Sequence, residues 1–145
     1  MAGEILLKSG EVKIRVIYAD TDAMGIVYHA SYIRWFEAGR TELCRELGVT
    51  GKGMESSSYY LPLTKLFCHY LLPARYDDLL IVETTIHDVK RASIEFGYRI
   101  FDEKKRRLLV RGSTIHACTN ETGNVVRIPK ILIDTLQYFK DVEGE

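Results

Sequence analysis

Two acidic residues and a histidine lie close together in the segment YADTDAMGIVYHASY, residues 18–32. Asp20, Asp22 and His29 are of types that act as general bases, and a carboxylate can also act as a nucleophile. Loop aspartates commonly accept hydrogen bonds from backbone amides instead, so an isolated pair of acids does not decide between catalysis and loop structure. The residue types therefore make this segment the first candidate for a site.

The elements on either side predict that this segment is a loop between a strand and a long helix. Residues 11–18 alternate between apolar and charged side chains, which indicates a half-buried strand. Its apolar positions are Val12, Ile14, Val16 and Tyr18. From about Ser31 the apolar residues recur every three or four positions, which is typical of a helix, and Gly48 supplies its end. The helical stripe consists of Tyr32, Phe36, Gly39, Leu43 and Leu47.

The remainder of the chain is predicted to form mainly strands separated by turns. Apolar or alternating segments cover residues 61–72, 79–89, 93–101 and 107–119, and residues 51–58 are a Gly- and Ser-rich connection that we expect to be mobile. Pro129 fits the first turn of a short helix with Leu132, Leu136 and Phe139 facing inward. One helix followed by a run of strands predicts an α+β domain over residues 1–145, in which an antiparallel sheet of about five strands wraps around one apolar helix. This arrangement is the hot-dog fold.

The string DTDAMGIVYHASYIRWFEAGRTE resembles the signature of the 4-hydroxybenzoyl-CoA and YbgC-like acyl-CoA thioesterases, which have this fold. The family pattern is an Asp, two residues, a Gly, an apolar pair, an aromatic residue, and then His or Tyr before the long helix. The positions that match are Asp22, Gly25, Ile26, Val27, Tyr28 and His29. Met24 departs from the small residue that many relatives have before the glycine, and we expect it to alter the shape of the pocket.

The resemblance implies that Asp22 is the catalytic carboxylate, either as nucleophile on the thioester carbonyl or as general base for a water. The backbone N–H of His29, near the helix start, is implied as the donor to the thioester oxygen, and the side chains of His29 and Tyr18 as supporting groups. The structural alternatives are that Tyr18 is the last inward residue of its strand and that His29 faces solvent. Asp20 is expected to hold the loop. The implied substrate contacts from the same motif are Gly25, Val27 and Tyr28.

A coenzyme A substrate also needs cations for its phosphates. The resemblance implies contacts from Lys90, Arg91 and Ser93 at a strand turn, and Arg127 is a second candidate, although charges at turns are usually solvated. The basic run at residues 104–107 is a solubilising loop or a contact for an acidic partner such as acyl carrier protein. An acyl or aryl pocket could be lined by Trp35, Phe36, Tyr59 and Tyr60, although the place of Phe36 in the helical stripe favours the core.

Relatives of this kind build their active sites between subunits, so the resemblance implies a homodimer or homotetramer. The sequence itself adds that an edge strand at residues 11–18 or 107–119 could pair across the interface.

Composition excludes several other classes. Twenty Lys and Arg residues balance twenty Asp and Glu residues, so no overall charge attracts nucleic acid or an anionic membrane. There is no apolar run of the ~20 residues that a membrane-spanning helix needs, and residues 1–8 lack the pattern of a signal peptide, so we expect a cytoplasmic protein. Cys44, Cys68 and Cys118 show no metal-ligand spacing, which favours reduced, partly buried thiols and neither a metal nor a cofactor.

Two alternatives to the thioesterase stay open. A hot-dog dehydratase or hydratase of 3-hydroxyacyl or enoyl chains uses a loop His with an acid on the central helix, where only Glu37, Glu42 and Glu46 are available. A non-catalytic module that binds acyl thioesters would keep the fold and lack turnover.

Overall fold

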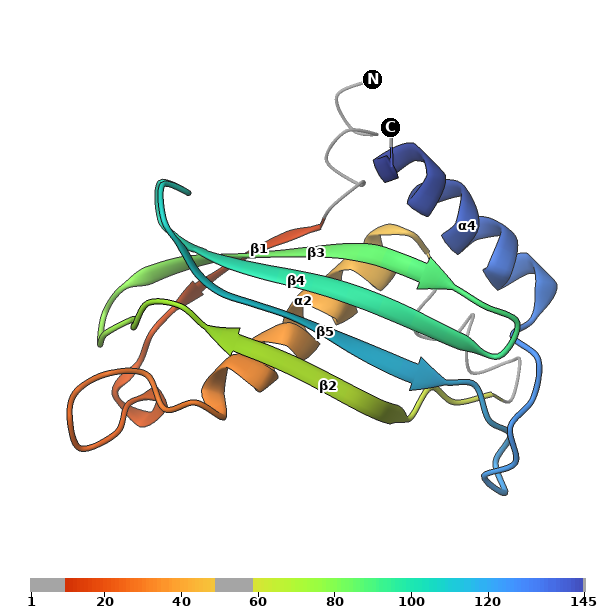
Figure 1. Ribbon diagram of the computed structural model, residues 1–145, viewed down its shortest axis with the longest axis horizontal. Coiled ribbons are helices and arrows are strands. Elements are labelled where there is room, and N and C mark those ends of the chain that lie inside the picture. Colours follow the sequence, from red (N-terminus) through yellow and green to blue (C-terminus); the bar gives the residue numbers. More distant parts are fainter. Residues whose placement is uncertain (1–9, 49–58, 145) are drawn as a thin grey trace.

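The computed structural model describes residues 10–48 and 59–144, which contain a five-stranded antiparallel sheet and two longer helices (Figure 1). In chain order the elements are β1 (Glu11–Arg15), the 3-10 turn η1 (Tyr18–Asp20), α2 (Ser31–Glu46), β2 (Leu63–Tyr70), β3 (Leu79–Val89), β4 (Ser93–Asp102), β5 (Leu108–Ala117) and α4 (Lys130–Gly144). The α+β class and the order of the elements are as predicted. The connection at residues 51–58 lies outside the described residues.

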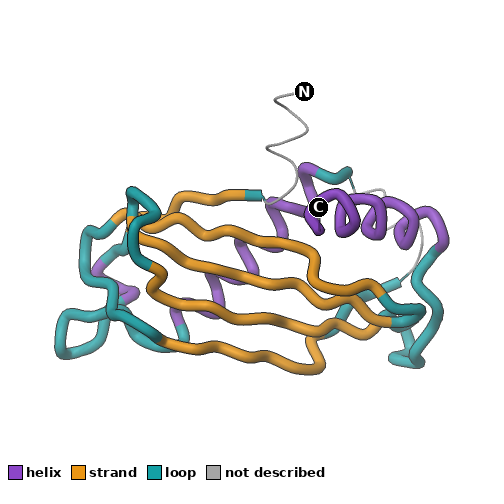
Figure 2. The backbone as a smooth tube through the Cα atoms, turned by 45° about the horizontal axis from the view of Figure 1, so that its top comes forward, coloured by secondary structure: helices purple, strands orange, loops and turns teal. Residues whose placement is uncertain are grey.

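The strands lie in the order β1-β3-β4-β5-β2, so β1 and β2 form the two edges (Figure 2). β2 precedes β3 in the sequence but crosses the sheet to pair with β5. The prediction that residues 11–18 include an edge strand is confirmed. The same prediction for residues 107–119 is wrong, because β5 lies between β4 and β2.

Alternation along β4 sorts its side chains between the two faces of the sheet. The apolar residues at every second position are all at most 2% exposed: Ile94, Phe96, Tyr98 and Ile100. Such alternation follows from the two-residue period of a strand, which turns successive side chains to opposite faces.

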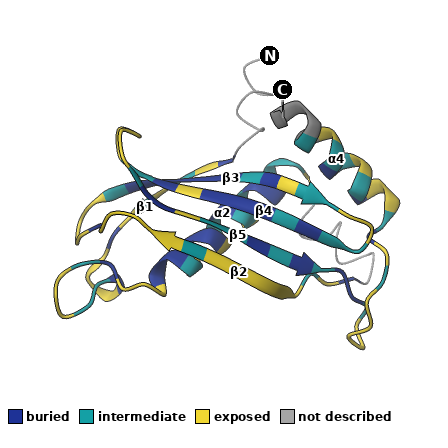
Figure 3. Cartoon of the chain, viewed as in Figure 1, coloured by how far each residue is buried: buried dark blue, intermediate teal, exposed yellow. Residues whose placement is uncertain are grey.

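Helix α2 packs on the inner face of the sheet, across β1, β3 and β4. The ring of Phe36 stacks on that of Tyr98, with 4.4 Å between the ring centroids. The helix backbone lies close to the sheet at Gly39, where an added Cβ would lie 2.3 Å from Thr84 Oγ1. Strand β2 is left largely exposed at the edge, as Figure 3 shows.

The first strand is shorter than predicted, because β1 ends at Arg15 and the chain then turns. The carboxylate of Asp20 accepts a hydrogen bond from the backbone N–H of Ile17 (2.9 Å), which closes the 3-10 turn η1. Tyr18 therefore begins this turn and is 81% exposed, so the alternative that it is an inward strand residue is wrong.

The C-terminal helix is longer than predicted. Helix α4 has 15 residues and is not short; it starts directly after Pro129, whose carbonyl accepts the N–H groups of Leu132 and Ile133. Leu132 and Leu136 are buried as predicted, whereas the side chain of Phe139 is not among those described.

The three cysteines are free thiols. Cys44 and Cys118 are buried and Cys68 is half-buried, and burial raises the pKa of Cys44 to about 11.

Candidate active site

The loop between η1 and α2 is a tight turn built around Asp22. The N–H of Asp22 donates to the carbonyl of Ile26 (2.9 Å), and the N–H of Gly25 donates to the carbonyl of Asp22 (3.0 Å). Gly25 has φ of +79°, a conformation that other residues rarely adopt, so the turn depends on a glycine at this position. Asp22 Oδ1 accepts the N–H of Met24 (2.8 Å), which orients the carboxylate.

Asp20 ties this loop to the helix that follows. Its carboxylate is almost completely buried and accepts a hydrogen bond from Arg34 of α2 (2.6 Å). Its carbonyl accepts the N–H of Tyr28 (2.8 Å) and the hydroxyl of Ser31 (3.1 Å). Asp20 thus has the loop-holding role expected from the sequence.

The start of α2 offers unpaired backbone donors. The helix begins at Ser31, two residues after the predicted donor, and its N-cap residue Ala30 has no side chain that can cap it. Within residues 10–48 and 59–144, the N–H groups of His29 and Ala30 make no hydrogen bond. Together with the helix dipole, such donors stabilise a negative charge that lies close to the helix N-terminus.

Asp22 and His29 line the same cavity of about 350 Å³ beside this helix start. The remaining walls are mainly apolar or aromatic: Ile26, Val27, Tyr32, Tyr70, Leu71, Leu72 and Pro73. A carboxylate, a histidine and a helix N-terminus therefore face a space suited to an apolar group. Of the predicted residues, Val27 also lines it, Gly25 shapes the turn, and the ring of Tyr28 packs against that of His29 with centroids 4.2 Å apart.

The structure places Tyr18 outside this cavity. Its ring packs edge-on against that of Tyr76, with centroids 6.3 Å apart, and most of its surface is exposed. A supporting role for Tyr18 stays a prediction.

The aromatic residues predicted to line a pocket lie elsewhere. Trp35 and Phe36 are in the core at 4% and 1% exposure, and Tyr59 is also buried. Tyr60 lines a different, open cavity beside Asn120.

Two tyrosines that the sequence did not single out for the pocket take this position. Tyr32 of α2 and Tyr70 of β2 both line the Asp22 cavity, and their rings meet edge-on with centroids 5.5 Å apart. The hydroxyl of Tyr70 donates to the carbonyl of His29 (3.0 Å). The sequence indicated Tyr32 only as a member of the helical stripe. No local pattern predicts that Tyr70 contacts His29, which lies 41 positions earlier in the chain.

The predicted phosphate-binding residues gather at the other end of the sheet. The N–H of Lys90 donates to the carbonyl of Ser93 (2.8 Å) in the β3–β4 turn. The N–H of Ile128 donates to the carbonyl of Arg91 (2.9 Å), which places the backbone of Arg127 beside this turn. The Asp22 loop instead meets the chain just before β3, where the N–H of Val27 donates to the carbonyl of Ala74 (2.8 Å).

The two groups of residues are therefore separated by the length of β3. Eleven residues of strand span about 33 Å at the usual rise per residue. Within one chain the structure brings the four phosphate-binding candidates together, but it does not bring them to Asp22.

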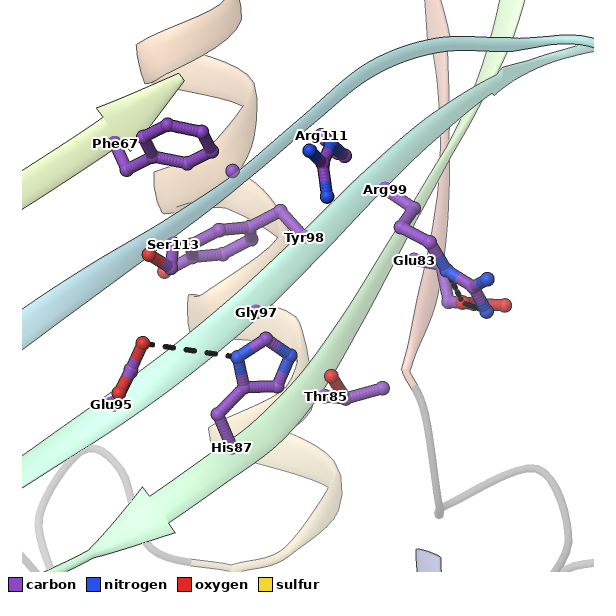
Figure 4. Close-up of a pocket in the computed structure, with 11 residues that line it drawn as sticks. Phe67, Glu83, Thr85, His87, Glu95, Gly97, Tyr98, Arg99, Arg111 and Ser113 are labelled. Atoms are coloured by element: carbon purple, nitrogen blue, oxygen red, sulfur yellow. Dashed lines mark hydrogen bonds and ion pairs between the residues drawn. The ribbon is translucent and has the colours of Figure 1, made fainter. Parts of the chain in front are cut away.

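A second cavity, of about 530 Å³, lies on the face of the sheet turned away from α2 (Figure 4). Its charged groups are largely paired with one another: Arg99 binds Glu83, and His87 Nδ1 lies 3.9 Å from Glu95. Burial raises the pKa of Glu83, but hydrogen bonds from Arg99 and Lys105 outweigh it and hold that pKa below its usual value. We therefore place the candidate active site at the Asp22 cavity, where the carboxylate and the backbone donors are available.

Among the described residues, no group of three or more His, Cys, Asp or Glu side chains is arranged to hold a metal ion. None of the described helices combines the length and the apolar character needed to cross a membrane.

The five-stranded antiparallel sheet around α2, with a carboxylate loop at the helix start, is the hot-dog fold of the thioesterases. The chain belongs to the thioesterase-like superfamily, whose pattern matches residues 16–136. This membership confirms the family, and with it the class of thioester hydrolases, that the motif at residues 20–42 predicted.

Individual relatives cover most of the chain. It is 37% identical over 120 residues to the acyl-CoA thioesterase YbgC of Haemophilus influenzae, which covers 81% of this chain and 86% of the relative. It is 36% identical over 121 residues to the acyl-CoA thioester hydrolase YbgC of Escherichia coli O6:H1, covering 83% and 90%. Among solved structures, the DHNA-CoA thioesterase from Staphylococcus aureus superposes with a TM-score of 0.82 at 29% identity, covering 94% of this chain and 91% of that one.

Proposed function

We infer that this protein hydrolyses the thioester bond of acyl-CoA substrates in the Asp22 cavity. The observation that carries the proposal is that Asp22 and His29 line one largely apolar cavity, and that the N–H of His29 makes no hydrogen bond within residues 10–48 and 59–144. The names of the relatives, which act on acyl-CoA, support the same substrate class.

In this proposal the thioester carbonyl oxygen lies at the N–H of His29. The negative charge that develops on the oxygen during attack is stabilised by this donor and by the positive end of the helix dipole. In one route Asp22 attacks the carbonyl carbon and the coenzyme A thiolate leaves, which forms a mixed anhydride that water then hydrolyses to the free acid. In the other route Asp22 removes a proton from a water that attacks the carbonyl carbon, and the same thiolate leaves. Its Oδ1 accepts the backbone N–H of Met24, and its Oδ2 accepts no hydrogen bond within the described part of the chain. The His29 side chain is the proposed supporting group in the cavity.

We propose further that the active unit is a homodimer formed through β2. Within residues 10–48 and 59–144, this strand pairs with β5 alone, so its other edge has no strand partner. It also carries a row of exposed apolar side chains, and exposed apolar edges of this kind favour pairing with another strand. The exposed residues in and beside it are Leu63, Leu66, Phe67, Tyr70, Leu71 and Leu72. Two such dimers could associate into the homotetramer that the resemblance implies.

A dimer of this kind accounts for the separation between Asp22 and the cations. A two-fold axis that pairs two β2 strands runs them antiparallel, so the Leu63 end of one strand lies beside the Tyr70 end of the other. In each chain Asp22 lies near the Tyr70 end, and the phosphate-binding candidates lie toward the Leu63 end. Each site would thus combine Asp22 of one chain with Lys90, Arg91, Ser93 and Arg127 of the other.

The alternatives have weaker support. Of the acids on α2, Glu37 is exposed, Glu42 pairs with Arg45, and Glu46 is the last residue of the helix. None of them is therefore set against the loop histidine at the helix start as a dehydratase would need. In the basic hairpin, Lys105 is bound to Glu11 and Glu83, which reduces the charge available to an acyl carrier protein.

The test is hydrolysis of a panel of acyl-CoAs, from short aliphatic through long-chain to benzoyl types, followed by thiol release. Turnover well above the no-enzyme reaction supports the thioesterase, and the preferred acyl group defines the substrate. A folded protein that binds acyl-CoA without turnover over the whole panel would instead be a binding module. Cytoplasmic location stays a prediction.

A further inference from the structure

The hydroxyl of Tyr70 provides the hydrogen bond that the carbonyl of His29 otherwise lacks. His29 precedes the N-cap residue Ala30, so its carbonyl has no partner within the helix, and the N–H of Ile33 donates to the carbonyl of Ala30 (3.2 Å). Within the described part of the chain, the hydroxyl of Tyr70 is the one donor to the carbonyl of His29, at 3.0 Å. A side chain of the edge strand therefore holds the residue that leads into the helix.

This carbonyl belongs to the segment that holds the proposed oxyanion donors. It shares a rigid peptide unit with the N–H of Ala30, and it adjoins the N–H of His29 through a single Cα atom. If the carbonyl were free to rotate, both N–H groups would lose their orientation. A carbonyl oxygen turned toward the cavity would also place a negative dipole end where negative charge develops.

The Tyr70 side chain is itself held in place. Its ring packs edge-on against Tyr32, which is buried at the start of α2. Partial burial raises the pKa of the Tyr70 hydroxyl above its usual value, so the group remains protonated and able to donate at neutral pH.

We propose that Tyr70 is a positioning residue of the active site: by donating to the carbonyl of His29, it fixes the backbone donors that stabilise the oxyanion. The inference rests on the proposed function. It assigns a role to β2 that the recognised motif, which ends before this strand, does not contain.

The experiment compares the wild-type protein with Tyr70→Phe, which keeps the ring and removes only the hydroxyl. Tyr138→Phe, an exposed tyrosine on α4 away from the cavity, is the matched control. We expect kcat to fall by about tenfold in Tyr70→Phe, the net effect of one misaligned donor, with KM changed less than about twofold. The shape of the pH–rate profile should stay as in the wild type, because Tyr70 transfers no proton.

A second readout does not depend on turnover. In the substrate-free protein, the 13C chemical shift of the His29 carbonyl should change in Tyr70→Phe and stay unchanged in Tyr138→Phe. An unchanged shift in Tyr70→Phe would overturn the hydrogen bond, and unchanged kcat would overturn the positioning role. A rise in KM alone would show that Tyr70 binds substrate and does not position the donors. Loss of one limb of the pH–rate profile would show that Tyr70 transfers a proton. If the wild-type protein had no thioesterase activity but the shift still changed in Tyr70→Phe, the proposed function would be wrong and the hydrogen bond would be confirmed.

Discussion

The proposed composite site can be tested by mixing two variants that are each impaired at a different part of the site. Asp22→Asn removes the carboxylate, and Arg91→Glu reverses a charge proposed to bind phosphate, about 33 Å away along β3 in the same chain. If each site takes Asp22 from one chain and Arg91 from the other, a mixed dimer has one site with both defects and one site with none. Arg91→Glu alone should lower kcat/KM by about 10- to 100-fold, the usual effect of losing a charge-assisted hydrogen bond.

The magnitude follows from random pairing. After equimolar unfolding and co-refolding, half of the dimers are mixed and each holds one intact site, so about a quarter of the wild-type specific activity should return. Further association of dimers leaves this fraction unchanged. The assay is thiol release at a substrate concentration below KM, with each variant refolded alone as the control.

Sites built within one chain would give a different result. Every site in a mixed dimer would then carry one of the two defects, and the mixture would show only the mean of the two separate variants. That outcome, in dimers shown to have mixed, would refute the two-chain site.

Two further predictions concern the fold. In Gly39→Val the new Cβ alone would lie 2.3 Å from Thr84 Oγ1, which is too close for two unbonded atoms. The substitution should lower the free energy of unfolding, measured by urea denaturation, by about 1–3 kcal/mol. Thr41→Val, exposed on the same helix, should have little effect, and an equal loss in both would refute the steric argument. Burial opposes ionisation of Glu83, but Arg99 lowers the pKa of this carboxyl below its ordinary value. The ionised carboxylate therefore stabilises the fold at pH values above the ordinary glutamate pKa. This stabilisation is lost as the pH falls through the lowered pKa. Glu83→Gln should therefore reduce the difference in Tm between pH 7 and pH 3, and an unchanged difference would contradict the pairing.

Local patterns in the sequence were sufficient for most of the fold. The inward residues of β4 and the stripe of α2 follow from periods of two and about 3.6 residues, which depend only on neighbouring positions. The same holds for the site around Asp22 and His29. These residues lie in one short loop, so a motif in the sequence is also a cluster in space.

Contacts between distant segments could not be read in this way. The placement of β5 inside the sheet depends on β2 crossing over to pair with it, and no local pattern records that crossing. Tyr70 reaches the carbonyl of His29 for the same reason. The sequence also suggested one coenzyme A site from residues that the length of β3 holds apart within a single chain.

The most direct test of the central claim is kcat for Asp22→Asn on the preferred acyl-CoA. The substitution is nearly isosteric and removes the nucleophile or base, so turnover should fall by about two to four powers of ten. The melting temperature and acyl-CoA binding should stay close to those of the wild type. Hydrolysis by Asp22→Asn at the wild-type rate would contradict the assignment of Asp22 as the catalytic carboxylate.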